Sequence, residues 1–128
     1  MAGTEERSRR TTLTPVGTRW SALIAFCAHG PSGDADAPDD PAHPTWEIKN
    51  LHVRPDLRRT GSGGRLFDLA VAHARDVGAR SLTLWVVEGN ASARAFYGKK
   101  GMATDGGRTT HTLGADGTMP VVRYRLTL

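Results

Sequence analysis

Hydrophobic and polar positions along the chain fall into short stretches that predict strands. Residues 20–28 and 45–53 are rich in β-forming side chains, and residues 81–87 (SLTLWVV) are apolar on both faces. A run that is apolar on both faces is typical of a strand covered on both sides of a sheet. The turn signal Pro-Val-Gly-Thr at 15–18 predicts a further short strand before the strand at 20–28.

The stretch 45–53 (TWEIKNLHV) alternates irregularly. Strict alternation places Trp46 and Ile48 on one face of a strand and Leu51 and Val53 on the opposite face. The register slips near Asn50, and such a slip indicates a β-bulge.

Helical periodicity follows this stretch. Residues 63–78 carry a stripe with helical spacing, whose members are Leu66, Leu69, Ala70, His73 and Val77. Gly78 is a typical residue for the end of that helix. A second helix is predicted to begin after Asn90, a common capping residue, and to run to Lys100.

The remaining segments complete the prediction of an α+β fold. Residues 31–44 (PSGDADAPDDPAHP) contain four prolines and four aspartates, which predicts a long acidic loop. The strand at 45–53, the helix at 63–78 and the strand at 81–87 predict a right-handed βαβ unit. Asp116 and Gly117 predict a turn between two C-terminal strands.

Composition indicates one globular domain. The chain has 128 residues, 38% of them hydrophobic and 23% charged. Residues 13–128 are predicted to form a single domain, and the polar, arginine-rich residues 1–12 a mobile tail. Cys27 is the one cysteine, so no intramolecular disulfide can form, in agreement with a cytoplasmic location. No stretch approaches the apolar length of a membrane span.

Charge and aromatic content narrow the classes of partner. The net charge of +4 is compatible with anionic ligands. The three tryptophans, two tyrosines and three phenylalanines lie mostly on apolar-patterned elements, so a nucleic-acid-binding domain is disfavoured. The five histidines show no ligand spacing, and no metal is expected.

The segment from Arg58 to Gly64 lies between a predicted strand and a predicted helix. Its glycines allow backbone N–H groups to approach a ligand at the helix N-terminus, where a pyrophosphate is favoured. The dinucleotide fingerprint needs glycine at Leu66, and the Walker loop needs a Gly-Lys-Ser/Thr sequence that the chain lacks. The nucleophile elbow of hydrolases, if centred on Ser62, would need glycine at position 60, where this chain has Thr60. None of these three motifs fits.

The pattern that fits is R/Q-x-x-G-x-G/A, present as Arg58-Arg59-Thr60-Gly61-Ser62-Gly63. It resembles the acyl-CoA loop of the GNAT family, the Gcn5-related N-acetyltransferases. Downstream, LWVVEGNASARAFYGKKGM resembles the second motif of that family. The resemblance covers residues 20–128. It implies a mixed, mainly antiparallel sheet with flanking helices and two central parallel strands that splay apart.

The resemblance also implies acetyl-CoA as co-substrate and a set of residues around it. In the family, pantetheine pairs with the first central strand and the pyrophosphate lies on the loop. The cofactor-binding residues implied here are Leu51, Val53, Arg58, Arg59, Thr60, Gly61, Ser62, Gly63, Gly64, Asn90 and Phe96. Asn90 is expected to cap its helix in any case.

Two residues match the catalytic positions of the family. A primary amine is almost wholly protonated at neutral pH, so direct attack on a thioester needs a base. Glu47 matches the position of that base, and an ion pair with Lys49 or an arginine is the alternative. Tyr97 matches the usual general acid, and a core aromatic beside Phe96 is the alternative.

The resemblance implies an N-acetyltransferase that acts on a primary amine of a small molecule or protein. Only about 20 largely polar residues precede Trp20, so the acceptor-binding N-terminal region of the family is expected to be shortened. A non-catalytic CoA-binding module or a truncated subunit is therefore the alternative. The sequence is also compatible with a homodimer, and it does not define the acceptor substrate.

Overall fold

The computed structural model describes residues 12–16, 25–58, 61–112 and 114–128. They fall into two compact units, Met1–Leu82 with Leu128 and Thr83–Thr127, which are described separately. The predicted tail lies outside the described residues except for Thr12, and the prediction of one domain over residues 13–128 stays a prediction.

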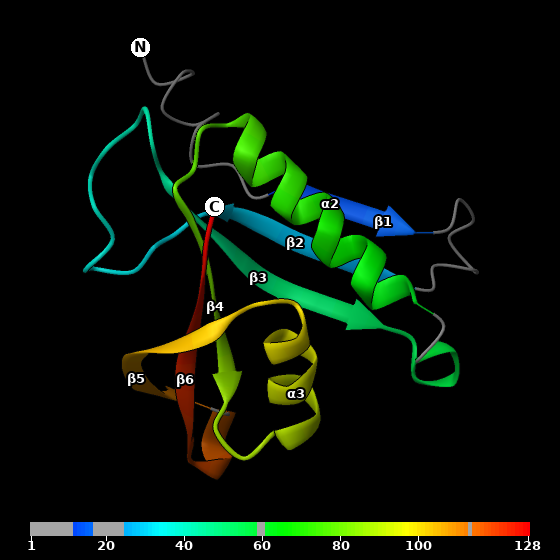
Figure 1. Cartoon of the computed structure of the whole chain (residues 1–128). Coiled ribbons are helices and arrows are strands. Elements are labelled where there is room, and N and C mark those ends of the chain that lie inside the picture. Colours follow the sequence, from blue (N-terminus) through cyan, green and yellow to red (C-terminus); the bar gives the residue numbers. More distant parts are fainter. Residues whose placement is uncertain (1–11, 17–24, 59–60, 113) are drawn as a thin grey trace. The chain divides into compact units, whose positions relative to one another are not determined.

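The first unit contains three antiparallel strands and a long helix (Figure 1). Its elements are β1 (Thr12–Val16), β2 (Ala25–Pro31), β3 (Thr45–Val53), the 3-10 helix η2 (Pro55–Leu57), α2 (Ser62–Asp76) and the beginning of β4 (Ser81–Val87). β2 lies between β1 and β3. The short strand before β2 and the acidic loop after it are as predicted. Of the strand predicted at 20–28, residues 20–24 lie outside the described residues, and β2 extends to Pro31, beyond the expected end at Ala28.

A β-bulge interrupts β3 at Lys49. Ile48 lies opposite His29 and Asn50 lies opposite Ala28, so Lys49 is an extra residue on β3. The bulge predicted near Asn50 is therefore confirmed. A bulge bends its strand and increases the local twist.

The bulge reverses the alternation expected after it. Residues directly opposite each other in an antiparallel pair share a face of the sheet. Leu51 and Val53 lie opposite Cys27 and Ala25, which share a face of β2 with His29 and therefore with the apolar residues before the bulge. The prediction of opposite faces was wrong, because the extra residue shifts the period by one.

This shared face packs against α2 through a cluster of rings. Trp46 Nε1–H donates a hydrogen bond of 3.0 Å to Nδ1 of His29, which is 1% exposed. The ring of His73 on α2 lies 5.2 Å from His29 and 5.4 Å from Trp46, measured between centroids. Burial and the neighbouring His73 lower the pKa of His29.

The buried stripe of α2 differs from the predicted one. Its buried residues are Ser62, Leu66, Phe67, Ala70, Val71 and Ala74. Leu69 and Val77 are 52% and 37% exposed, so their assignment to the core stripe was wrong. The helix presents Phe67 and Val71 to the sheet instead, which rotates the buried face by about one residue relative to the expected stripe.

The C-terminal end of α2 contacts the acidic loop. Gly78 has φ +84, the left-handed conformation that typically ends a helix, as predicted. A Cβ at Gly78 would lie 2.8 Å from the carbonyl oxygen of Ala42, and His43 Nδ1 lies 3.1 Å from the carbonyl oxygen of Gly78. The loop therefore packs onto this turn so closely that only glycine fits.

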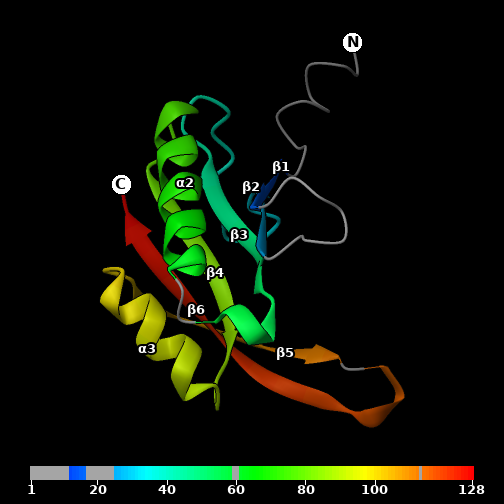
Figure 2. The same cartoon turned by 90° about the vertical axis from the view of Figure 1, so that its right-hand side faces the viewer.

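The second unit contains most of β4, the helix α3 (Ala91–Lys99) and a hairpin of long strands. The hairpin comprises β5 (Ala103–Thr112), η3 (Gly114–Asp116) and β6 (Thr118–Thr127), and β6 lies between β4 and β5 (Figure 2). A turn at Asp116 and Gly117 was predicted, and these residues do fall in the connection, which also includes η3. β4 is largely buried, as its apolar sequence predicts.

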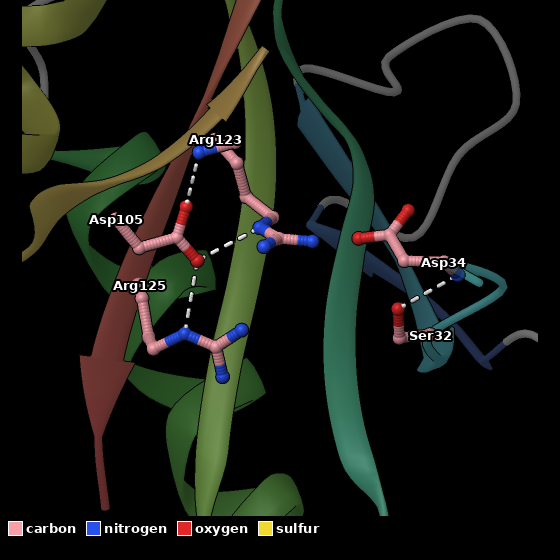
Figure 3. A network of polar contacts seen from close by, with 6 residues as sticks. Ser32, Asp34, Asp105, Arg123 and Arg125 are labelled. Carbon is pink, nitrogen blue, oxygen red and sulfur yellow. Dashed lines mark hydrogen bonds and ion pairs between the residues drawn. The ribbon is translucent and has the colours of Figure 1, made fainter. Parts of the chain in front are cut away.

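A carboxylate clamp stabilises this hairpin. Asp105 Oδ2 accepts hydrogen bonds from Nε of Arg123 at 2.8 Å and Nε of Arg125 at 3.0 Å (Figure 3). Burial alone would raise the pKa of Asp105, but the Gly107 N–H and the two guanidinium groups lower it. Arg123 is 7% exposed and lies 5.3 Å from the centroid of the Trp85 ring.

The helices and predominantly antiparallel strands confirm the α+β class. None of the helices within the described ranges has the length and apolar character needed to cross a membrane.

We predict that the free energy of unfolding falls when the pH is lowered through the range below about 6.5, the ordinary pKa of histidine. The lowered pKa of His29 means that the unfolded chain takes up this proton first, so stability is present above the unfolded pKa and lost below it. The slope approaches at most about 1.4 kcal/mol per pH unit for one proton. Urea denaturation at a series of pH values measures it.

His29→Gln should reduce this slope, because glutamine can still accept the Trp46 N–H but does not titrate. His111→Gln, at an exposed position of β5, is the matched control and should retain the slope. An unchanged slope in His29→Gln would contradict the assignment.

Candidate active site

The N-terminus of α2 provides a turn of backbone amides that is suited to an anion. Gly61 occupies the N-cap with φ +90, and the Arg65 N–H donates to the Gly61 carbonyl oxygen at 3.1 Å as the helix begins. Apart from Gly61 and its chain neighbours, no atom of the described residues lies within 4 Å of a Cβ built on Gly61, and the first turn contains no acidic residue. The amides of a first helical turn lack intrahelical acceptors, and the helix dipole favours negative charge there.

The residues expected around this turn are only partly described. Arg58 is exposed directly after η2, whereas Arg59 and Thr60 lie outside the described residues. Ser62 is buried, and Gly63 and Gly64 are partly buried in the first turn of α2.

The 3-10 helix η2 was not expected from the sequence. It begins with Pro55, and Asp56 forms a bidentate ion pair with Arg54, at 2.7 and 3.0 Å. The proline at a first helical position is the signal that could have revealed it.

Leu51 and Val53 lie on β3 after the bulge. Both are partly buried on the face that packs against α2. Leu51, Val53 and the N-terminus of α2 therefore belong to the same unit and follow one another along the chain.

Glu47 lies on the other face of β3, before the bulge, and is half-buried. Its opposite residue on β2 is Gly30, which contributes no side chain beside the carboxylate. Burial raises the pKa of Glu47, and the negative charge of Asp34 raises it further. Lys49 and two hydrogen bonds, from the Ser32 hydroxyl and the Gly33 N–H, act in the opposite direction without cancelling the rise.

Sequence reasoning missed Ser32 and Gly33 as neighbours of Glu47. They belong to the stretch interpreted only as an acidic loop. No local signal could have found them, because their approach to Glu47 depends on the register between β2 and β3. The serine does predict a local turn, since a serine hydroxyl commonly accepts the N–H two residues on. This bond is present at 3.1 Å.

The second unit contains the other candidate residues, Asn90, Phe96 and Tyr97. The Asn90 side chain accepts the Ala93 N–H at 3.1 Å, which confirms the predicted cap of α3. The rings of Phe96 and Tyr97 meet edge to face at 5.1 Å between centroids, and Tyr97 lies 6.4 Å from the Tyr124 ring.

Arg94 stabilises the turn that precedes α3. Its Nε donates to the Tyr124 hydroxyl at 3.0 Å, and its Nη1 donates to the Glu88 carbonyl oxygen at 3.0 Å. The Glu88 side chain forms an ion pair of 2.8 Å with Arg108 on β5. These contacts position the turn that carries Asn90 relative to β6.

Two other chemistries receive no support. Burial raises the pKa of Cys27 to about 11, so the thiol is protonated and unreactive at neutral pH. Within the described ranges, no three His, Cys, Asp or Glu side chains gather in a way that could hold a metal ion.

The sequence profile of the acetyltransferase (GNAT) family matches residues 9–102. The chain belongs to the GNAT family. The Mycobacterium tuberculosis protein named Probable N-acetyltransferase is 36% identical to it over 108 residues, which are 84% of this chain and 60% of that protein. This GNAT chain thus spans about 60% of the length of that curated relative.

Solved GNAT structures share the fold of the chain. The Escherichia coli ribosomal-protein-S18-alanine N-acetyltransferase has a TM-score of 0.70 at 21% identity, over 98% of this chain and 74% of that chain. A Bacillus subtilis acetyltransferase in complex with CoA has a TM-score of 0.69 at 17% identity, over 99% and 82%. Together with the family match, they confirm the predicted GNAT fold.

We predict that Asn90→Ala lowers the free energy of unfolding by about 1 kcal/mol, because it removes the acceptor of the Ala93 N–H at the start of α3. Asn90→Ser retains a capping oxygen and should lose only a small part of that stability. Urea denaturation of both variants measures the difference. Equal stability of the two variants would show that the cap contributes nothing.

Proposed function

We propose that this GNAT protein is an acetyl-CoA-dependent N-acetyltransferase that acts on a primary amine of a small molecule or a protein. The observation that carries the proposal is the glycine-rich start of α2, within a chain matched by the GNAT profile over residues 9–102. The buried, unpaired Cys27 is compatible with a reducing compartment, and we place the reaction in the cytoplasm.

The proposed binding site for CoA is the N-terminal turn of α2. The left-handed Gly61 and the absence of acidic side chains in the first turn support it, because backbone amides can approach a pyrophosphate there. Arg58 and Arg59 would add charge-assisted hydrogen bonds to the phosphates. Thr60, Ser62, Gly63 and Gly64 would complete the loop around them. Acetyl-CoA itself supplies the acetyl group as an activated thioester.

The proposed contact with pantetheine is the backbone of Leu51 and Val53. The bulge at Lys49 supports this assignment, because it bends β3 just before these residues. The splaying of the central strands, which the family fold implies, stays a prediction. Asn90 and Phe96 are proposed to contact the cofactor from the start and middle of α3.

The proposed general base is Glu47. Its raised pKa supports this role, since a base is most effective when its pKa approaches the working pH. The carboxylate would accept a proton from the acceptor ammonium, directly or through a water molecule, and leave a neutral amine that can attack. Tyr97 is proposed to donate a proton to the departing thiolate.

A non-catalytic CoA-binding module, or a subunit that another chain completes, is the second candidate. Its acceptor site would be incomplete in this chain alone. A homodimer is one way in which a second chain could complete the acceptor site.

We predict that Gly61→Val abolishes binding of acetyl-CoA in isothermal titration calorimetry. At φ +90 a β-branched residue is strained by roughly 1–2 kcal/mol or more, and the backbone must move away from the position that presents the amides. The strain comes from the backbone conformation, because among the described residues beyond its chain neighbours no atom lies within 4 Å of the added Cβ.

Gly106→Val is the matched control. Gly106 has φ +89 and equally open surroundings, but it lies on β5 in the second unit. This variant should lose comparable stability and retain its affinity for acetyl-CoA. Wild-type affinity in Gly61→Val would overturn the proposed binding site.

We further predict that the protein releases free thiol from acetyl-CoA in the presence of a suitable amine. Glu47→Gln should lower kcat/KM by roughly 10²–10⁴-fold, the usual contribution of a general base. In the wild type, activity should fall as the pH drops through the raised pKa of Glu47, because protonation removes the base. Tyr97→Phe should lower kcat while leaving CoA affinity unchanged.

A thiol-release assay across a panel of amines decides between the two candidates. Binding of acetyl-CoA without thiol release from any amine in the panel would favour the non-catalytic module. Unchanged kcat in Tyr97→Phe would remove Tyr97 from the role of general acid.

A further inference from the structure

The hairpin between β2 and β3 brings Ser32 beside Glu47. The antiparallel ladder runs through the pair formed by Pro31 and Trp46, and the Ser32 N–H then donates to the Thr45 carbonyl oxygen at 2.8 Å. Ser32 thus extends the ladder by one residue beyond β2. Side chains alternate along a strand, so Ser32 shares a face with Gly30, the residue opposite Glu47. Ser32 therefore lies on the same face as Glu47.

The hydroxyl of Ser32 is oriented by its own loop. The Asp34 N–H donates to Ser32 Oγ at 3.1 Å (Figure 3). This bond occupies a lone pair of the hydroxyl and leaves its proton available as a donor. The Glu47 carboxylate on the same face is within the reach of that proton by its place in the ladder, and hydrogen bonding from the Ser32 side chain and the Gly33 backbone lowers the pKa of Glu47.

We propose that Ser32 is a positioning residue that, together with the Gly33 amide, fixes the orientation of the Glu47 carboxylate for proton abstraction. The proposal rests on the proposed function, in which Glu47 is the general base. An ionised carboxylate offers about four acceptor sites. The two donors from the loop occupy two of them, so acceptor sites remain for the proton of an amine or of a bridging water.

The groups around Glu47 shift its pKa in opposite directions. Burial and Asp34 disfavour the ionised carboxylate, whereas Lys49 and the two hydrogen bonds favour it. Hydrogen bonds to the charged form of an acid lower its pKa. Loss of the Ser32 hydroxyl should therefore raise the pKa of Glu47 further and reduce the fraction of active base at neutral pH.

The test compares Ser32→Ala with Ser32→Thr, which retains the hydroxyl. Titration of the Glu47 side-chain carboxyl by ¹³C NMR in the full chain reads its pKa without requiring activity. The pKa should shift upward in Ser32→Ala and return toward the wild-type value in Ser32→Thr. The acidic limb of the kcat/KM profile should shift in the same direction.

Asp39→Asn is the control for general effects of the loop charge. Asp39 is exposed in the same loop and is not among the groups that shift the pKa of Glu47, so this variant should leave the titration unchanged. Thermal denaturation of each variant verifies that it is folded.

The outcomes separate the two proposals. A Glu47 pKa that is the same in Ser32→Ala as in the wild type would overturn the positioning role of Ser32. Persistence of the acidic limb in Glu47→Gln would overturn the role of Glu47 as base, whatever Ser32 does to its titration. Loss of that limb in Glu47→Gln, with an upward shift in Ser32→Ala, supports both.

Discussion

The single extra residue at Lys49 determines which side chains of β3 reach which face. Without the bulge, Leu51 and Val53 would lie on the same face as Glu47, and the face under α2 would lose two apolar residues. With it, the apolar residues on both sides of the bulge pack toward α2. The insertion therefore keeps Leu51 and Val53 off the face that carries Glu47, because the side-chain period of a strand is two.

Much of the fold could be predicted from local signals. Gly78 and Asn90 mark helix boundaries through backbone conformation and capping, which depend on residues close in sequence. The exposure of Leu69 could not be predicted in this way. Helical spacing placed it on an apolar stripe, but the side of α2 that meets the sheet is decided by packing of Phe67 and Val71 against distant strands.

The residues of the candidate site also differ in whether the sequence could predict them. The glycine-rich turn and Glu47 were visible because their residue types match a family pattern over a short stretch. Ser32 was not visible, since its approach to Glu47 depends on the register between two strands and on a turn within an acidic loop. Composition described that loop correctly as acidic but gave no information about its hydrogen bonds.

The close packing of Ala42 against Gly78 changes how the acidic loop can vary. One end of the loop continues the β2–β3 ladder at Ser32, and the other rests on the turn after α2. Pro38 and Asp39, which are exposed between these attachments, are consequently positions at which charge can diverge among related proteins at little energetic cost. Evolution could therefore alter the electrostatic character of this surface without disturbing the hydroxyl that lies against the carboxylate.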